Sequence, residues 1–150
     1  MDSNLIFRLK EFYTLETFQV AFYKAQVSSA TDEYYGKAFN KMVNIEQGHA
    51  DFFANKIEKA NETVPTFVGS VFEFTGNLLG ETVESTGQLN TCKLGIALEN
   101  KAMKEYRTFI LESKEKSYLI LQDTLMEYLL DEEFHTLWLR DYLNNSPNKS

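Results

Sequence analysis

The chain has 150 residues, of which 43% are hydrophobic, so we expect one domain, residues 1–150, with a single substantial core. Its formal net charge of -7 argues against nucleic acid and anionic membrane surfaces as partners, because phosphate binding needs a basic patch, and favours cations. With one cysteine, no N-terminal signal pattern and no apolar run of membrane-spanning length, it has the features of a soluble cytoplasmic protein.

The first predicted helix covers residues 4–28, with Ser3 or Asn4 as its N-cap. Apolar residues recur at steps of three and four and place Glu16 on the inward face. A second apolar stripe on this helix comprises Leu15, Phe18 and Phe22. Such a wide apolar surface predicts either a dimer contact or cover from another segment, and we expect a homodimer or a small homo-oligomer.

The second predicted helix covers residues 31–60 and follows a short turn at residues 28–32 that supplies its N-cap. Its inward face carries Glu46 and His49. Residues 61–89 differ from this pattern, because one proline and four glycines interrupt apolar residues there. We interpret them as a long crossover that contains a short helix, about residues 66–79.

Two further helices are predicted over residues 90–113 and 117–143. The first of them places Glu99 inward, and the second places Glu132 and His135 inward. The predicted fold is therefore all-α, a four-helix bundle of two antiparallel helix hairpins joined by the long crossover.

The motif Glu-x-x-His occurs twice, as Glu46/His49 and Glu132/His135, and it includes both histidines of the chain. On a helix, this spacing puts a carboxylate and an imidazole on one face, about one turn apart, where they can hold a metal ion. Two helices with Glu-x-x-His and two with a single inward Glu form the ligand set of a dinuclear carboxylate site. The predicted ligands are Glu16, Glu46, His49, Glu99, Glu132 and His135.

The positions of these ligands agree with the predicted turns. In a tight antiparallel hairpin, residues equidistant from the turn lie level, so a turn at residue 31 brings Glu16 level with Glu46. A turn just after Glu115 likewise brings Glu99 level with Glu132 in the second hairpin. Each pair then lies roughly 22 Å from its turn, at 1.5 Å per residue.

Four glutamates and two imidazoles suit two first-row metal ions. Two divalent ions neutralise four carboxylates, which would otherwise repel one another in an apolar core. The inward faces carry almost no lysine or arginine, so a structural salt-bridge network does not explain the glutamates. Oxygen-rich ligation with imidazole fits iron or manganese better than structural zinc, and we expect two iron ions, with manganese as the alternative.

Other polar residues near the ligands have two interpretations each. Asp131 either orients the imidazole of His49 through a hydrogen bond or is a solvated surface residue. Four tyrosines lie one or two turns from ligands, where they either contact the carboxylates, take part in electron transfer or simply pack in the core. They are Tyr13, Tyr23, Tyr106 and Tyr128. Cys92 and Met103 are interpreted as packing residues.

From Leu5 to Leu143 the ligand pattern resembles that of the ferritin-like diiron carboxylate proteins. Within that superfamily it is most similar to the demethoxyubiquinone hydroxylase group, through Glu16-x6-Tyr23-x2-Gln26, Glu46-x-x-His49-x-Asp51, the crossover with Pro65 and Glu132-x-x-His135. Bacterioferritins share the six ligands, but Gln47 stands where they have a haem-binding methionine. Rubrerythrins have a CxxC module, and this chain has one cysteine.

The resemblance implies an oxidoreductase that reacts with dioxygen or peroxide at two irons. Acidic residues in the crossover, Glu73, Glu81 and Glu84, argue against membrane association and a quinone substrate. Two alternatives remain open at this point. One is a protein that sequesters iron without oxidising a substrate, and the other is a regulatory bundle that retains the metal site.

Overall fold

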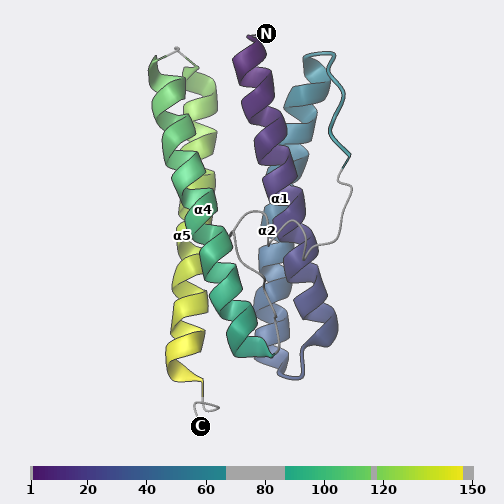
Figure 1. Ribbon diagram of the computed structural model, residues 1–150, viewed down its shortest axis with the longest axis vertical. Helices are drawn as coiled ribbons and strands as arrows, with labels where there is room; N and C mark the ends of the chain where they lie inside the picture. The colour runs from purple at the N-terminus through teal and green to yellow at the C-terminus, as the bar shows by residue number, and fades with distance from the viewer. Residues whose placement is uncertain (1, 67–86, 116–117, 147–150) are drawn as a thin grey trace. The chain divides into compact units, whose positions relative to one another are not determined.

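The computed structural model describes residues 2–66, 87–115 and 118–146, and these residues form helices and no strand (Figure 1). The helices are α1 (Ser3–Ser29), α2 (Glu33–Lys59), α4 (Gln88–Glu115) and α5 (Leu119–Asn145). Each begins and ends within two residues of its predicted boundary. The all-α class is therefore confirmed for the described residues.

The chain divides into two compact units, Met1–Glu81 and Thr82–Ser150. In the first unit α1 packs along α2, and in the second α4 packs along α5. Both pairs are antiparallel hairpins, as predicted (Figure 1). The short crossover helix at about residues 66–79 falls almost entirely outside the described residues. The association of the two hairpins into one four-helix bundle and one domain stays a prediction.

Side-chain caps fix the start of each helix in the first unit. The Asp2 carboxylate accepts a hydrogen bond from the backbone N–H of Asn4 at 3.0 Å, so the prediction of Ser3 or Asn4 as N-cap was wrong by one or two residues. Asp32 caps α2 in the same way, accepting from the N–H of Tyr34 at 2.9 Å. An aspartate at this position satisfies one of the N–H groups that the first turn leaves without an intrahelical acceptor.

The C-terminus of α2 is closed by a Schellman motif. The N–H of Asn61 donates to the carbonyl of Glu58, and the N–H of Glu62 donates to the carbonyl of Ile57. Asn61 takes a left-handed backbone with φ 58°, which asparagine tolerates better than most residues. The Nζ of Lys10 then contacts Glu62 Oε2 at 2.8 Å, which ties the end of α2 to the start of α1.

Aromatic side chains dominate the core between α1 and α2. The ring centroids of Phe12 and Phe53 lie 5.3 Å apart, and those of Tyr23 and Phe39 lie 5.4 Å apart. The second apolar stripe of α1 is also buried within the chain, with Leu15 at 6%, Phe18 at 0% and Phe22 at 5% exposure. The burial of this stripe within the chain therefore removes the reason given for an oligomer. The homodimer or small homo-oligomer stays a prediction.

The α4–α5 hairpin has a mixed core. The rings of Tyr106 and Tyr128 meet edge to face at 6.3 Å, and Phe109 is 1% exposed. Ile110, the next residue on α4, is only half-buried. At the open end of the hairpin, the hydroxyl of Tyr142 lies 3.2 Å from Oε1 of Gln88, which joins the C-terminal part of α5 to the start of α4.

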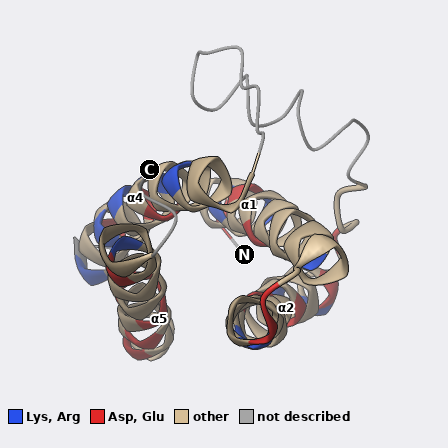
Figure 2. Cartoon of the chain, turned by 90° about the horizontal axis from the view of Figure 1, so that it is seen from below, with Lys and Arg blue, Asp and Glu red and all other residues tan. Residues whose placement is uncertain are grey.

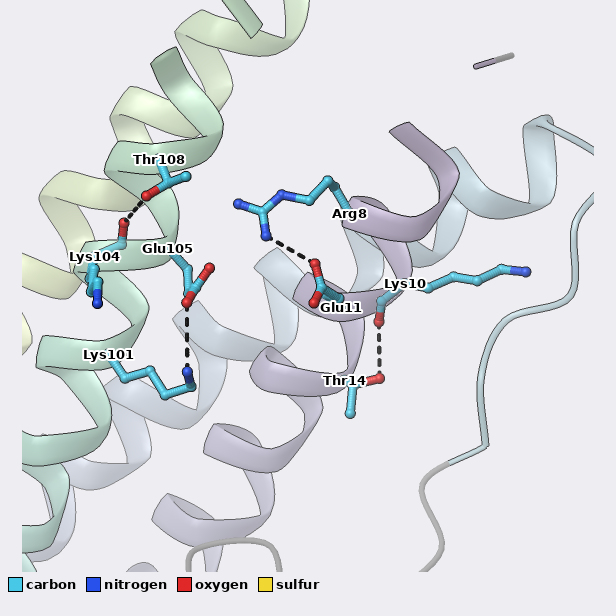
Figure 3. Close-up of polar contacts among 8 residues, drawn as sticks. All are labelled: Arg8, Lys10, Glu11, Thr14, Lys101, Lys104, Glu105 and Thr108. Atoms are coloured by element: carbon cyan, nitrogen blue, oxygen red, sulfur yellow. Dashed lines mark hydrogen bonds and ion pairs between the residues drawn. The ribbon is translucent and has the colours of Figure 1, made fainter. Parts of the chain in front are cut away.

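The outer helix surfaces carry charged residues of both signs (Figure 2). Figure 3 shows two of the pairs, Arg8–Glu11 on α1 at 2.9 Å and Lys101–Glu105 on α4 at 3.6 Å. Solvent-exposed pairs one turn apart contribute about 0.3–0.5 kcal/mol each, so the helices depend mainly on their buried faces. No helix in the described part of the chain has an apolar stretch sufficient to cross a bilayer.

Candidate metal centre

Buried acidic residues are few in the described part of the chain. They are Glu16, Glu46, Glu99 and Glu132, each with 0% exposure. Both histidines are buried as well, His49 at 2% and His135 at 5%. These six residues are the six predicted ligands. The helices thus bury the carboxylates of the predicted set and leave every other described acidic residue at least partly exposed.

Three of the six side chains meet in the first unit, and we call them the α1–α2 triad: Glu16, Glu46 and His49. The Nδ1 of His49 lies 3.1 Å from an oxygen of Glu46 and 3.4 Å from an oxygen of Glu16. Glu46 and His49 share one face of α2, as the three-residue spacing requires, and Glu16 approaches from α1. One ligand atom from each of the three lies within 4.8 Å of the others.

The second unit repeats this arrangement as the α4–α5 triad: Glu99, Glu132 and His135. The Nδ1 of His135 lies 3.4 Å from an oxygen of Glu99 and 3.8 Å from an oxygen of Glu132. Here too one ligand atom from each residue lies within 4.8 Å of the others. The prediction that each hairpin brings its two glutamates level is confirmed, because one imidazole is close to both.

The distances within each triad suit a metal ion. Ligand atoms bound at about 2.1 Å from an ion lie about 3.0 Å apart at right angles and about 3.4 Å apart in a tetrahedron. The α1–α2 triad, with 3.1 and 3.4 Å, falls in this range. The α4–α5 triad, with 3.4 and 3.8 Å, needs a small contraction of its Glu132 contact. Each triad can therefore hold one ion through two carboxylates and one imidazole.

The buried charge also favours cations. No lysine or arginine within residues 2–66, 87–115 and 118–146 is fully buried. The largely buried side chain of Arg8, 12% exposed, pairs with Glu11 at 2.9 Å and lies about two turns before Glu16 along α1. Positive charge for the carboxylates must come from protonated histidines, from bound protons or from metal ions. Two protonated histidines would still leave each triad with a net charge of about -1, whereas a divalent ion in each would neutralise it.

The residues beside the triads differ between the two units. One turn after Glu16 lies the buried Gln19, whereas one turn after Glu99 lies the buried Ala102. The sequence analysis did not single out Thr136, a buried residue whose hydroxyl donates to the backbone carbonyl of Glu132 at 2.9 Å. Its position four residues after Glu132, on the same helix face, was the signal that would have identified it.

The other predicted neighbours have mixed outcomes. Tyr23 and Tyr106 are buried at 0% exposure, while Tyr13 and Tyr128 are half-buried. Cys92 is a buried free thiol, and Met103 is 7% exposed, which agrees with their interpretation as packing residues. Asp131 is half-buried, and a hydrogen bond to His49, which lies in the other unit, stays a prediction.

No family model and no curated protein matches the chain. The resemblance to diiron proteins accordingly depends on the six ligand positions and their order along the helices.

Proposed function

We propose that the α1–α2 triad and the α4–α5 triad together form one dinuclear iron centre in a ferritin-like four-helix bundle, and that the protein is an oxidoreductase that reacts with dioxygen or peroxide. Manganese is the alternative metal. The observation that supports this most is the selective burial of four glutamates and two histidines, arranged as two Glu–Glu–His sets. A purely structural role would not require both sets to contain the same ligand types.

The charges of the two sets support two ions instead of one. Four carboxylates carry about four negative charges, and two divalent ions balance them. Carboxylates bind in one or two modes and can bridge ions, while an imidazole nitrogen fixes an ion from one side. Bound iron at these ligands would supply one-electron redox chemistry for the reduction of dioxygen or peroxide.

The protein residues would bind, orient and shield the centre. Glu16 and Glu99 extend from helices that carry no second ligand, whereas each Glu-x-x-His pair holds its carboxylate and imidazole on one rigid helix face. Aromatic side chains near the ligands exclude bulk water, since Tyr23 and Tyr106 are fully buried. A water-poor site strengthens the electrostatic attraction between ligand and ion.

An anaerobic titration with Fe(II) tests the proposal. The wild-type chain should bind about two Fe(II), measured by elemental analysis after removal of free metal. Replacing either histidine, in His49→Ala or His135→Ala, should weaken binding by about 10-fold or more. Glu58→Gln, which changes an exposed glutamate on α2, is the matched control and should retain both ions. One ion per chain, or equal binding by all variants, would refute the dinuclear centre.

Admission of dioxygen or peroxide to the loaded protein then separates the functions. An oxidoreductase keeps its two irons bound through repeated cycles of reduction and oxidation. A protein that stores or sequesters iron oxidises many Fe(II) per chain and accumulates ferric iron away from the site. Continuous uptake of this kind would refute the oxidoreductase and favour sequestration, while two ions bound without any oxidation would favour a regulatory bundle.

A further inference from the structure

The outer face of α5 carries an exposed apolar stripe, which we call the α5 stripe. It consists of Leu119, Met126, Leu130, Phe134 and Leu137, which are 63%, 42%, 47%, 66% and 61% exposed. With about 100° between successive residues of a helix, these five lie within an arc of about 80°. The arc lies opposite the face that carries Glu132 and His135. Helix α5 therefore has a buried ligand-bearing face and an apolar face on its outside.

Single exposed apolar residues are normal on protein surfaces, but a continuous stripe along a helix is not. The α5 stripe extends over 18 helical steps, a length of about 27 Å. At roughly 100 Å² per side chain it offers about 500 Å², near the upper end of apolar patches on monomers. A surface of this kind on a helix of a charged protein indicates a contact with another molecule.

Four of the five stripe residues are placed symmetrically along the helix. Leu119 and Leu137 lie nine residues on either side of Tyr128, and Met126 and Leu130 lie two residues on either side of it. Two such helices, packed antiparallel about a twofold axis level with residue 128, would bring these four apolar positions opposite one another, while Phe134 would lie level with Gln122 of the second copy. Isologous contacts of this kind are the commonest in homodimers.

We propose that the α5 stripe is the contact between two copies of this chain, with their α5 helices antiparallel. Leu119 then packs against Leu137 of the second copy, and Met126 packs against Leu130 of the second copy. Leucine and methionine at these spacings form the seam of an antiparallel helix pair.

Two acidic residues of α5 bear on the contact with a second copy, Asp123 within the arc of the stripe and Glu133 at its edge. Asp123 and Glu133 lie five residues on either side of residue 128, so the antiparallel arrangement brings Asp123 level with Glu133 of the second copy. Two carboxylates alone would repel. However, Glu133 Oε1 lies 3.1 Å from an Nη of Arg107 on α4, and that guanidinium can join both acids. The proposed dimer has two such Asp–Arg–Glu groups, one on each side of the twofold axis.

The size of the stripe predicts a reversible dimer. A standard stable interface covers about 800 Å² on each partner, and the apolar stripe alone supplies less. Ile120, next to Leu119 on α5, is 86% exposed and can add to the contact. We expect monomers and dimers to interchange at concentrations on the order of micromolar.

Sedimentation equilibrium of the full chain over a range of concentrations tests the dimer. The wild type should dimerise, and Leu130→Glu should weaken dimerisation at least 10-fold, because it places two charges near the twofold axis. Leu130 is exposed, so the variant should keep the helical circular dichroism of the wild type. Phe7→Glu, at an exposed phenylalanine of α1 with 60% exposure, is the control and should dimerise normally. Equal dimerisation of Leu130→Glu and the wild type would overturn the proposal.

Cysteine cross-linking tests the antiparallel arrangement. When Leu119→Cys and Leu137→Cys chains are mixed and oxidised, the two variants should form a disulfide with each other. Leu119→Cys alone should not cross-link, because its two copies would lie about 27 Å apart. The native Cys92 is buried, and the wild type serves as the background control. Cross-linking of Leu119→Cys alone would indicate parallel helices and overturn the proposed contact.

A third variant tests the role of Arg107. Arg107→Gln should weaken dimerisation severalfold, and less at high salt, because it leaves Asp123 and Glu133 of two copies without the shared cation. A wild type that stays monomeric at every concentration would overturn the proposal. In that case residues 67–86 or a different protein would be the candidates for covering the α5 stripe.

Discussion

The two triads use the same ligands in different surroundings. Each takes one glutamate from the first helix of its hairpin and a Glu-x-x-His pair from the second. The buried neighbours of the ligands differ between the units. Three residues after the first glutamate lies Gln19 in one unit and Ala102 in the other. If packing had determined these positions, the neighbours should also match. The repetition of ligand types agrees with the proposal that each hairpin contributes ligands to a metal centre.

The triads differ in geometry as well. The contacts of His49 with its two glutamates are 3.1 and 3.4 Å, while those of His135 are 3.4 and 3.8 Å. The α1–α2 triad is thus closer to the spacing that one ion requires of its ligand atoms. Because a preorganised site loses less free energy in ordering its ligands, we expect the α1–α2 triad to bind the first ion.

The largest expected effect is that of metal on thermal stability. Ions bind the folded triads far better than the unfolded chain, so free metal at about 1,000 times its dissociation constant should stabilise the fold by about 4 kcal/mol. For a chain of this size that corresponds to a rise of roughly 10 °C in Tm. Differential scanning calorimetry of the chelator-treated and the Fe(II)-loaded protein under anaerobic conditions measures it.

The His49→Ala/His135→Ala double variant is the control for that measurement. It removes the imidazole from both triads and should lose most of the metal-dependent rise in Tm. Each single variant should keep part of the rise, and His49→Ala should lose the larger part if the α1–α2 triad binds more tightly. An equal rise in the double variant would locate the metal elsewhere on the protein.

A smaller effect is expected from neutralising one carboxylate. Without metal, Glu46 lies buried beside Glu16, so Glu46→Gln removes a repulsion and a desolvated charge and should stabilise the metal-free protein by about 1–2 kcal/mol. The same variant should lose binding of one ion. Urea unfolding in the presence of a chelator measures the stability, with the exposed Glu58→Gln as the control, expected to lie within about 0.5 kcal/mol of wild type.

The opposite result for Glu46→Gln would be equally informative. A less stable metal-free variant would mean that a protonated His49, 3.1 Å from Glu46, already balances this carboxylate. The α1–α2 triad would then be a buried ion pair in the absence of metal. The corresponding Glu132→Gln variant, where the imidazole lies 3.8 Å away, would show whether the two triads differ in this respect.

Much of the fold could be predicted from the sequence because the helices have strong local signals. Apolar residues at steps of three and four located all four described helices, and the turn around residue 31 followed from its polar composition. The errors concern caps. The N-cap of α1 is Asp2, and not Ser3 or Asn4 as predicted. Asn61, the left-handed residue that ends α2, was not predicted because asparagine has this role less often than glycine.

The candidate site was predictable for a different reason. Burial of a carboxylate is costly without a partner, so a glutamate within an apolar helical pattern, such as Glu16 or Glu99, is a strong signal. The details of packing around it were not predictable. The α5 stripe was not predicted either, although the helical spacing of Leu130 and Phe134 puts them opposite Glu132 and His135, and their exposure confirms that they face away from the core.

The smallest expected effect concerns Gln19, the neighbour that distinguishes the α1–α2 triad. Its side chain is buried one turn from Glu16, where an amide N–H can hold a carboxylate in position for an ion. Gln19→Leu keeps the size of the side chain but removes this donor, so it should weaken binding of the first ion about fivefold, corresponding to about 1 kcal/mol. Binding of the second ion should not change. Calorimetric titration with Co(II), followed by its visible absorption, resolves the two steps.

The matched control for this change lies on the same helix. Gln26 is half-buried and its amide approaches the backbone carbonyl of Phe22 at 3.4 Å, further along α1 from Glu16, so Gln26→Leu should leave both binding steps unaltered. If Gln19→Leu also binds both ions as the wild type does, the difference between the triads must come from the imidazole distances and not from the glutamine. If it weakens the second ion instead, the order of filling inferred from the geometry is reversed.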